Sequence, residues 1–72
     1  MTEKKILIMF GDRVRELRKE IGISQEELAF KADLHRTYIG MIERAEKNIT
    51  LINAEKISKA LNVKLSQLFI EF

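Results

Sequence analysis

The chain has 72 residues, of which 46% are hydrophobic and 33% are charged, so it is long enough for one small domain and too short for two. It contains no cysteine, which excludes a disulfide framework, a thiolate metal site and a cysteine nucleophile, and we expect a cytoplasmic protein. The net charge of +2 excludes a polycation that holds nucleic acid by bulk charge alone.

The N-terminal segment KKILIMF is basic and then apolar. Its apolar run is too short for a secretion signal or a membrane span, so we expect no membrane association and place these residues in a core or an interface. A first helix is predicted from about Leu7 to Glu20, because apolar residues recur there at helical spacing. Its expected apolar stripe consists of Phe10, Val14, Leu17 and Ile21.

Turn signals divide the middle of the chain. Gly22 is expected to close the first helix in the left-handed conformation. The segment SQEE that follows has the pattern of a capping box, with Ser24 at the N-cap and Glu27 three residues later, and it predicts a short second helix. Asp33 tolerates positive φ, so KADLH is expected to form a tight turn before a third helix from about His35 to Arg44.

The last third of the chain predicts two further helices. Thr50 is expected to cap a fourth helix that Asn62 ends, and LSQLFIEF suits a final short helix. The stripe of the fourth helix would be Leu51, Ala54, Ile57 and Leu61. Proline is absent and no strand alternation is visible. The expected fold class is therefore all-α, a compact bundle of five short helices in one domain of residues 1–72, with residues 1–6 flexible.

The expected third helix separates two kinds of side chain when its residues are placed at intervals of about 100°. Ile39, Ile42 and His35 fall within one arc, and Tyr38 lies on the flank. The opposite side carries Arg36, Thr37, Gly40, Met41 and Arg44. Arginine can donate two hydrogen bonds to guanine, and threonine can meet a thymine methyl. A short helix set across another by a tight turn is a helix-turn-helix, whose second helix enters the major groove of DNA.

Three segments at a characteristic spacing, RVRELRKEIG, SQEELAFKADLHRTYIGMIER and ISKALNVKLSQLF, resemble the phage-repressor-like, or Xre-type, helix-turn-helix family. The resemblance covers about residues 9–69 and implies a lambda-repressor-like bundle with the helix-turn-helix in the second and third helices. Within that family the short chain and the segment LHRTYIGMIER look most like the controller proteins of restriction-modification systems.

The resemblance also implies roles for individual positions. Bases of DNA would be read by Arg36, Thr37, Gly40 and Met41. Phosphates would be bound by Gln25, His35, Tyr38, Arg44, Lys47 and Asn48. An ion pair between Arg18 and Glu43 would tie the first helix to the third. The dimerisation segment would be residues 65–72, and the interface would be formed by Ile52, Leu65, Leu68, Phe69 and Phe72.

Some positions have a second interpretation or depart from the family pattern. Tyr38 could pack in the core with its hydroxyl outward, His35 could cap the third helix, and Gln25 could belong simply to a well-capped helix start. Asp33 and Ala45 stand where the family usually has glycine, and His35 stands where it usually has Ser, Thr or Asp.

The composition allows two classes of function. An enzyme is excluded by the single histidine and by the absence of a glycine-rich phosphate loop, and no metal or cofactor is expected. We therefore expect a sequence-specific, dimeric transcription regulator that binds double-stranded DNA and a second copy of itself and can contact RNA polymerase. The alternative is an antitoxin-like or phage-repressor-like module that acts mainly through a protein partner.

Overall fold

The computed structural model describes residues 4–69, and every regular element in this range is helical. The elements are α1 (Lys4–Glu20), α2 (Gln25–Ala32), α3 (Arg36–Glu43), α4 (Leu51–Ala60) and the 3-10 helix η1 (Leu65–Phe69). The all-α prediction is confirmed, but the described range holds four α-helices rather than five, because the last element winds as a 3-10 helix. Helix α1 also begins at Lys4, before the expected start near Leu7.

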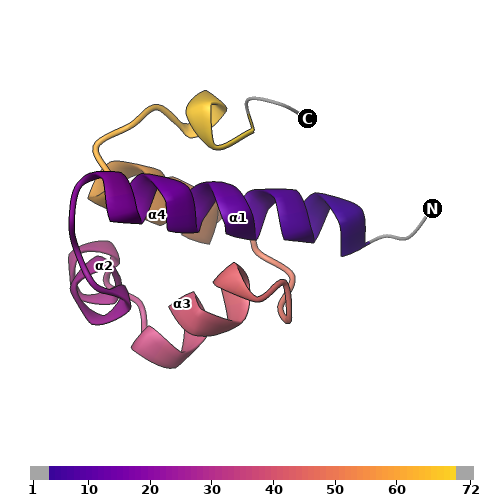
Figure 1. The fold of residues 1–72 in the computed structure, drawn as a ribbon, viewed down its shortest axis with the longest axis horizontal. Helices are drawn as coiled ribbons and strands as arrows, with labels where there is room; N and C mark the ends of the chain where they lie inside the picture. Colours follow the sequence, from indigo (N-terminus) through magenta and orange to yellow (C-terminus); the bar gives the residue numbers. More distant parts are fainter. Residues whose placement is uncertain (1–3, 70–72) are drawn as a thin grey trace.

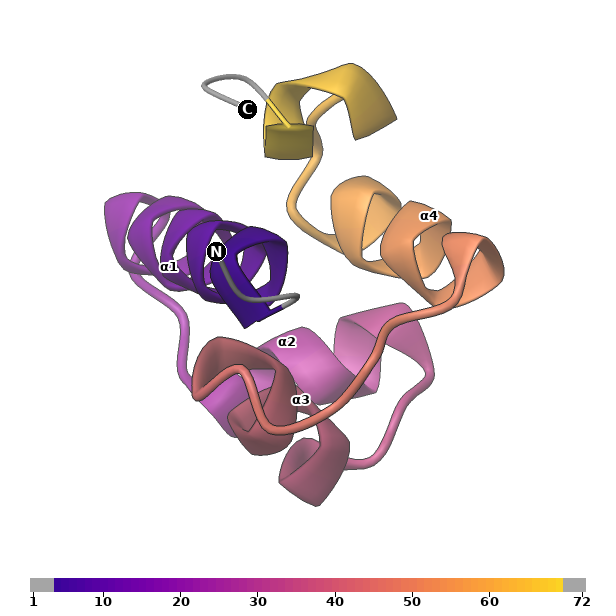
Figure 2. The same cartoon turned by 90° about the vertical axis from the view of Figure 1, so that its right-hand side faces the viewer.

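The helices surround one core (Figure 1). Helix α3 packs against both α1 and α2, whereas α4 packs against α2. Element η1 covers the other side of α1 and α4. In Figures 1 and 2, α3 lies at the edge of the molecule opposite η1, so one long side of this helix faces away from the rest of the chain.

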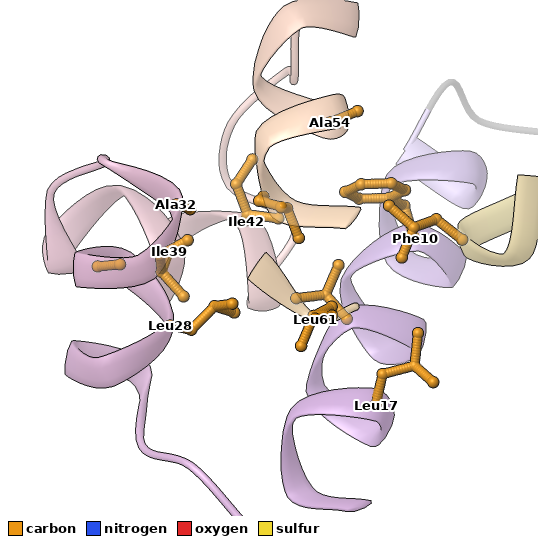
Figure 3. Close-up of a cluster of buried hydrophobic side chains, with 12 residues drawn as sticks. Phe10, Leu17, Leu28, Ala32, Ile39, Ile42, Ala54 and Leu61 are labelled. Carbon is orange, nitrogen blue, oxygen red and sulfur yellow. The ribbon is translucent and has the colours of Figure 1, made fainter. Parts of the chain in front are cut away.

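The core draws on every element: Figure 3 labels side chains from the four α-helices and their ends, and Leu68 adds the contribution of η1. Its fully buried large residues are Val14, Leu28, Ile39, Ile42, Ile57, Leu61 and Leu68. Two residues expected in apolar stripes lie outside it: Ile21 is 49% exposed and Leu51 is 76% exposed. Ile21 follows the last residue of α1, where the chain turns away, and Leu51 is the first residue of α4, beyond the reach of the core.

The starts of α2, α3 and α4 are closed by local side-chain hydrogen bonds. The hydroxyl of Ser24 accepts from the Glu27 amide at 3.0 Å, and the Glu27 carboxylate accepts from the Ser24 amide at 3.1 Å, which completes the predicted capping box. The Thr50 hydroxyl accepts from the Asn53 amide at 3.0 Å. Both predicted caps are confirmed, since each side chain satisfies an amide that has no partner inside its helix.

The four α-helices end in a common conformation. A residue with positive φ follows each helix, directly after α2 and at the second position after the other three: Gly22 75°, Asp33 58°, Ala45 60° and Asn62 61°. At the end of α2 the amide of Asp33 donates to the Phe30 carbonyl at 3.2 Å and that of Leu34 to the Ala29 carbonyl at 2.9 Å. This is the Schellman motif, and the same pair of bonds closes α1, α3 and α4.

The C-terminal segment contributes to the core of its own chain. Leu68, expected at a dimer interface, is 0% exposed, which corrects that prediction. Phe69 is half-buried, and its ring lies 5.3 Å from that of Phe10, measured between centroids. Leu65 is also half-buried, whereas Ile52 is 69% exposed. Phe72, the remaining predicted interface residue, lies outside the described residues.

Candidate nucleic-acid interface

Helix α3 begins at an unusual cap. His35 has an extended backbone, and its Nδ1 accepts a hydrogen bond from the Thr37 amide at 3.1 Å. The imidazole thus supplies the hydrogen-bond acceptor that a Ser, Thr or Asp side chain usually supplies at this position. It is exposed rather than grouped with Ile39 and Ile42, because helical angles do not apply to a cap residue with an extended backbone.

Arg36 and Thr37 form the first turn of α3 and project into solvent. The Arg36 side chain is 68% exposed, and its Nη1 lies 3.8 Å from Oε2 of Glu26, which is itself 75% exposed. A pair so long and so exposed restrains the guanidinium only weakly. The arginine fork is therefore free to reorient toward a ligand. Met41, one turn later, is half-buried.

Gly40 faces this side of α3 but is buried. A methyl group at this position would lie 3.0 Å from Nη1 of Arg44 and 3.6 Å from Oε1 of Gln25. The glycine thus makes room for two side chains of its own protein. The role of Gly40 in base reading stays a prediction, and in this structure the Arg44 side chain lies over it.

Gln25 links the second helix to the third. Its Nε2 donates to Oε1 of Glu43 at 3.0 Å, and the side chain is half-buried. One N–H of the amide group remains for another acceptor. Because Gln25 is also the first residue of α2, it lies where backbone N–H groups point out of the helix and favour anions.

Tyr38 joins α3 to α4. The Tyr38 hydroxyl accepts a hydrogen bond from Nδ2 of Asn53 at 3.1 Å, and the ring packs partly against the core. The ring is thus half-buried, as in the core interpretation, and the hydroxyl proton is available to an acceptor.

The segment after α3 carries three predicted phosphate-binding residues. Arg44, Lys47 and Asn48 are all exposed. Nε of Arg44 lies 3.1 Å from Oε1 of Glu46, with both side chains at least half exposed. All three residues follow the C-terminal end of α3, the helix that carries Arg36 at its start.

Beneath the surface, Arg18 and Glu43 form the ion pair expected between the first and third helices. Nε of Arg18 donates to Oε2 of Glu43 at 2.7 Å, and Nη2 donates to Oε1 at 3.0 Å. Glu43 is 3% exposed. The hydrogen bond to Glu43 raises the pKa of Arg18, an effect that burial opposes. Because the pKa of Arg18 is raised on folding, the charged pair stabilises the fold at every pH below the pKa of a free arginine. The stabilisation is lost only as the pH rises through the pKa of Arg18 in the folded protein.

Two residues of this cluster were not predicted from the sequence. Arg15 donates from Nη2 to the backbone carbonyl of Glu43 at 2.6 Å. Gly11 faces the same end of α3, with a methyl position 2.5 Å from the Ile42 carbonyl oxygen. A glycine inside an apolar helical pattern was the one hint of a close approach at Gly11.

Between residues 4 and 69, no three His, Cys, Asp or Glu side chains gather closely enough to hold a metal ion. Within the same range, none of the helices has the length and apolar character needed to cross a bilayer.

Comparison with known proteins decides the family. The model of the Helix-turn-helix family HTH_3 matches residues 14–68. The chain belongs to this family. Control protein C.BamHI of Bacillus amyloliquefaciens is 55% identical over 60 residues, which are 82% of this chain and 74% of that protein. Control protein C.MunI of Mycoplasma sp is 48% identical over 65 residues, 89% of this chain and 88% of that protein.

Solved helix-turn-helix structures agree with these relatives. The restriction-modification controller protein C.AhdI from Aeromonas hydrophila superposes with a TM-score of 0.86 at 46% identity, covering 88% of this chain and 96% of that one. The C.Esp1396I tetramer, solved with its natural 35 base-pair operator, gives 0.85 at 38% identity over 92% and 87% of the two chains. Among helix-turn-helix proteins, this chain thus belongs with the controller proteins of restriction-modification systems.

Proposed function

We propose that this protein is a sequence-specific transcription regulator that inserts α3 into the major groove of double-stranded DNA. The observation that carries the proposal is the first turn of α3, where the neighbouring residues Arg36 and Thr37 are both exposed to solvent. A guanidinium fork can bind guanine O6 and N7 together, and a threonine can meet a neighbouring base. The position of α3 at the edge of the molecule leaves this turn accessible (Figure 2).

The remaining residues of the interface divide into two roles. Arg36 and Thr37 would specify bases, with Met41 beside them making an apolar contact. The phosphates would be held by Gln25, His35, Tyr38, Arg44, Lys47 and Asn48. Several of these groups keep donors available to a phosphate: the second amide N–H of Gln25, the Tyr38 hydroxyl and the cations of the following loop. Gly40 would contribute by its missing side chain, which leaves room for the Arg44 side chain against α3.

The regulator would act as a homodimer on a near-palindromic operator. One short helix discriminates weakly, whereas a two-fold pair reads two half-sites about one turn of DNA apart. An apolar hollow of about 280 Å³ lies between the start of α1, the start of α4 and η1, and its lining includes Ile6, Leu51 and Phe69. Ile6, Leu51 and Ile52 are 53%, 76% and 69% exposed. Because exposed apolar side chains mark contact surfaces, we propose that a second copy of the chain covers them.

The membership among controller proteins suggests what is regulated. We infer that the protein controls its own gene and times a restriction enzyme behind its methyltransferase, in the cytoplasm, either by occupying a promoter or by contacting RNA polymerase. Catalysis would play no part. The related C.Esp1396I, solved as a tetramer with its operator, supports DNA and self-association as the two partners.

A module that mainly grips a protein partner is the second candidate, and the exposed apolar hollow favours it. The two candidates differ in what Arg36 does. A partner-binding module would tolerate Arg36→Ala in every DNA assay, whereas a regulator would not.

The test begins with selection of bound duplexes from a random pool, which yields both half-sites and their spacing. We expect Arg36→Ala to weaken operator binding by about 1–3 kcal/mol and to abolish the preference at one base position. Lys47→Ala is the matched control: it should weaken binding to all sequences alike and reduce the salt slope by about 1. Unchanged operator affinity in Arg36→Ala would refute the proposal.

A further inference from the structure

Gly11 lies in the middle of α1, which packs against α3, and faces the C-terminal end of that helix. A methyl group there would lie 2.5 Å from the carbonyl oxygen of Ile42 and 3.0 Å from that of Glu43. Both atoms belong to the backbone, so no side-chain rotation can relieve the contact. A glycine is unfavourable inside a helix, and here the unfavourable residue lies where the backbone of α3 leaves no room for a side chain.

The same face of α1 continues the contact one turn later. Nη2 of Arg15 donates to the Glu43 carbonyl at 2.6 Å, and Arg18 binds the Glu43 carboxylate at 2.7 and 3.0 Å. Residues 11, 15 and 18 are spaced so that they share one side of a helix. Together they fix one end of α3 against α1, by close approach at Gly11 and by charged hydrogen bonds beyond it.

The opposite end of α3 carries the side chains of the proposed DNA contact. Helix α3 has eight residues, so it is about 12 Å long, and Arg36 and Thr37 lie in its first turn. A helix fixed at its C-terminal end transmits any displacement at that end to its N-terminal turn. The separation of α1 and α3 at Gly11 therefore determines where Arg36 and Thr37 stand relative to a bound duplex.

We propose that Gly11 is a positioning residue for sequence recognition: its missing side chain sets the distance and tilt of α3 and so directs Arg36 and Thr37 at the base edges. The inference rests on the proposed function of those two residues. Hydrogen bonds to bases require donor–acceptor distances within a few tenths of an ångström, whereas long flexible cations adjust to a shifted phosphate. Displacing α3 therefore reduces discrimination between sequences more than it reduces overall attraction to DNA.

The experiment compares Gly11→Ala with the parent on the selected operator and on an unrelated duplex of equal length, at one salt concentration. We expect operator affinity to fall about tenfold, the size of one lost base contact, and non-specific affinity to change by less than about twofold. Ile57→Val is the control, because it truncates a buried side chain of α4 without altering the contact between α1 and α3. At temperatures where both variants are folded, Ile57→Val should keep the parent's specificity.

A second variant keeps the test decisive if Gly11→Ala does not fold. Arg15→Met removes the donor to the Glu43 carbonyl without adding bulk, and it should lower the ratio of specific to non-specific affinity in the same direction. If Arg15→Met instead lowers the affinity for both duplexes equally and reduces the salt dependence of binding, Arg15 is a phosphate contact, and its part in the inference is overturned.

Arg36→Ala, measured alongside, separates the proposed function of α3 from the positioning role of Gly11. If it leaves operator affinity unchanged, the proposed function of α3 fails. If Arg36→Ala loses affinity while Gly11→Ala and Arg15→Met bind the operator like the parent, the proposed function stands and the positioning role of Gly11 is overturned. That role is also overturned if Ile57→Val loses specificity to the same degree, because the loss would then reflect weakened folding alone.

Discussion

At the scale of single residues, Glu43 is the buried charge on which the helix-turn-helix depends. Its carboxylate is 3% exposed and accepts hydrogen bonds from Arg18 and from Gln25, while its backbone carbonyl accepts from Arg15. A buried carboxylate is tolerated only while it is paired and hydrogen-bonded, so the three partners hold α1, α2 and α3 together through one residue.

We predict that Arg18→Ala lowers the free energy of unfolding by about 3–5 kcal/mol, because it leaves the Glu43 carboxylate buried without its main partner. This is as much as one small core usually supplies, so the variant should be largely unfolded at room temperature and should bind all DNA sequences poorly. Urea denaturation followed by circular dichroism measures the change in the free energy of unfolding. Glu46→Ala, which breaks an exposed pair with Arg44, should cost less than about 1 kcal/mol. A parent-like melting curve for Arg18→Ala would contradict the prediction.

At the scale of helices, the common Schellman ending explains how four short helices reverse direction without proline. Gly22 and Asn62 are usual at such ends, and Asp33 tolerates the left-handed conformation, but Ala45 at φ 60° is strained by its methyl group. Ala45 is also 7% exposed, so the strain lies in the interior between α3 and the following loop.

We predict that Ala45→Gly stabilises the protein by about 0.5–1 kcal/mol, because relief of the strained left-handed alanine exceeds the added flexibility of the unfolded chain. The midpoint of thermal or urea unfolding measures the gain. Ala54→Gly is the matched control: the same replacement inside α4 should destabilise by about 1 kcal/mol or more. Equal destabilisation by both changes would show that Ala45 is not strained.

At the scale of the whole molecule, the apolar residues at the two ends of the chain have separate roles. Leu68 and the Phe10–Phe69 ring contact complete the core of the monomer, whereas Ile6, Leu51 and Ile52 remain on the surface beside the apolar hollow. The surface that we propose for dimerisation is therefore centred on the starts of α1 and α4 rather than on the buried part of η1.

We expect Ile52→Glu to shift the protein toward monomer in analytical ultracentrifugation at micromolar concentration, since a carboxylate in an apolar interface loses its hydration. The monomer should retain the parent's helical circular dichroism. Phe30→Ser provides the comparison, because Phe30 is 87% exposed on α2 and its loss should leave the sedimentation coefficient unchanged. A parent protein that sediments as a monomer at this concentration would count against the dimer.

The sequence alone determined the features that depend on a few neighbouring residues. The capping box of Ser24, the cap at Thr50, the left-handed turns at Gly22 and Asp33 and the helix end at Asn62 are local hydrogen-bonding or steric effects, and they were predicted where they occur. The pairing of Arg18 with Glu43 was expected only through the family resemblance, because 25 residues separate them and no local rule joins them.

Tertiary structure alone decided the features that depend on which distant segments meet. Leu68 is buried because η1 folds onto α1 and α4, and Gly40 is covered because Arg44 and Gln25 converge on it. The same dependence explains why Gly11 could be seen as unusual in the sequence but understood only beside the carbonyl groups of Ile42 and Glu43. The periodicity of one helix predicts in which direction each of its side chains points. Whether a side chain is buried also depends on where a second helix lies, and the sequence pattern of one helix does not contain that position.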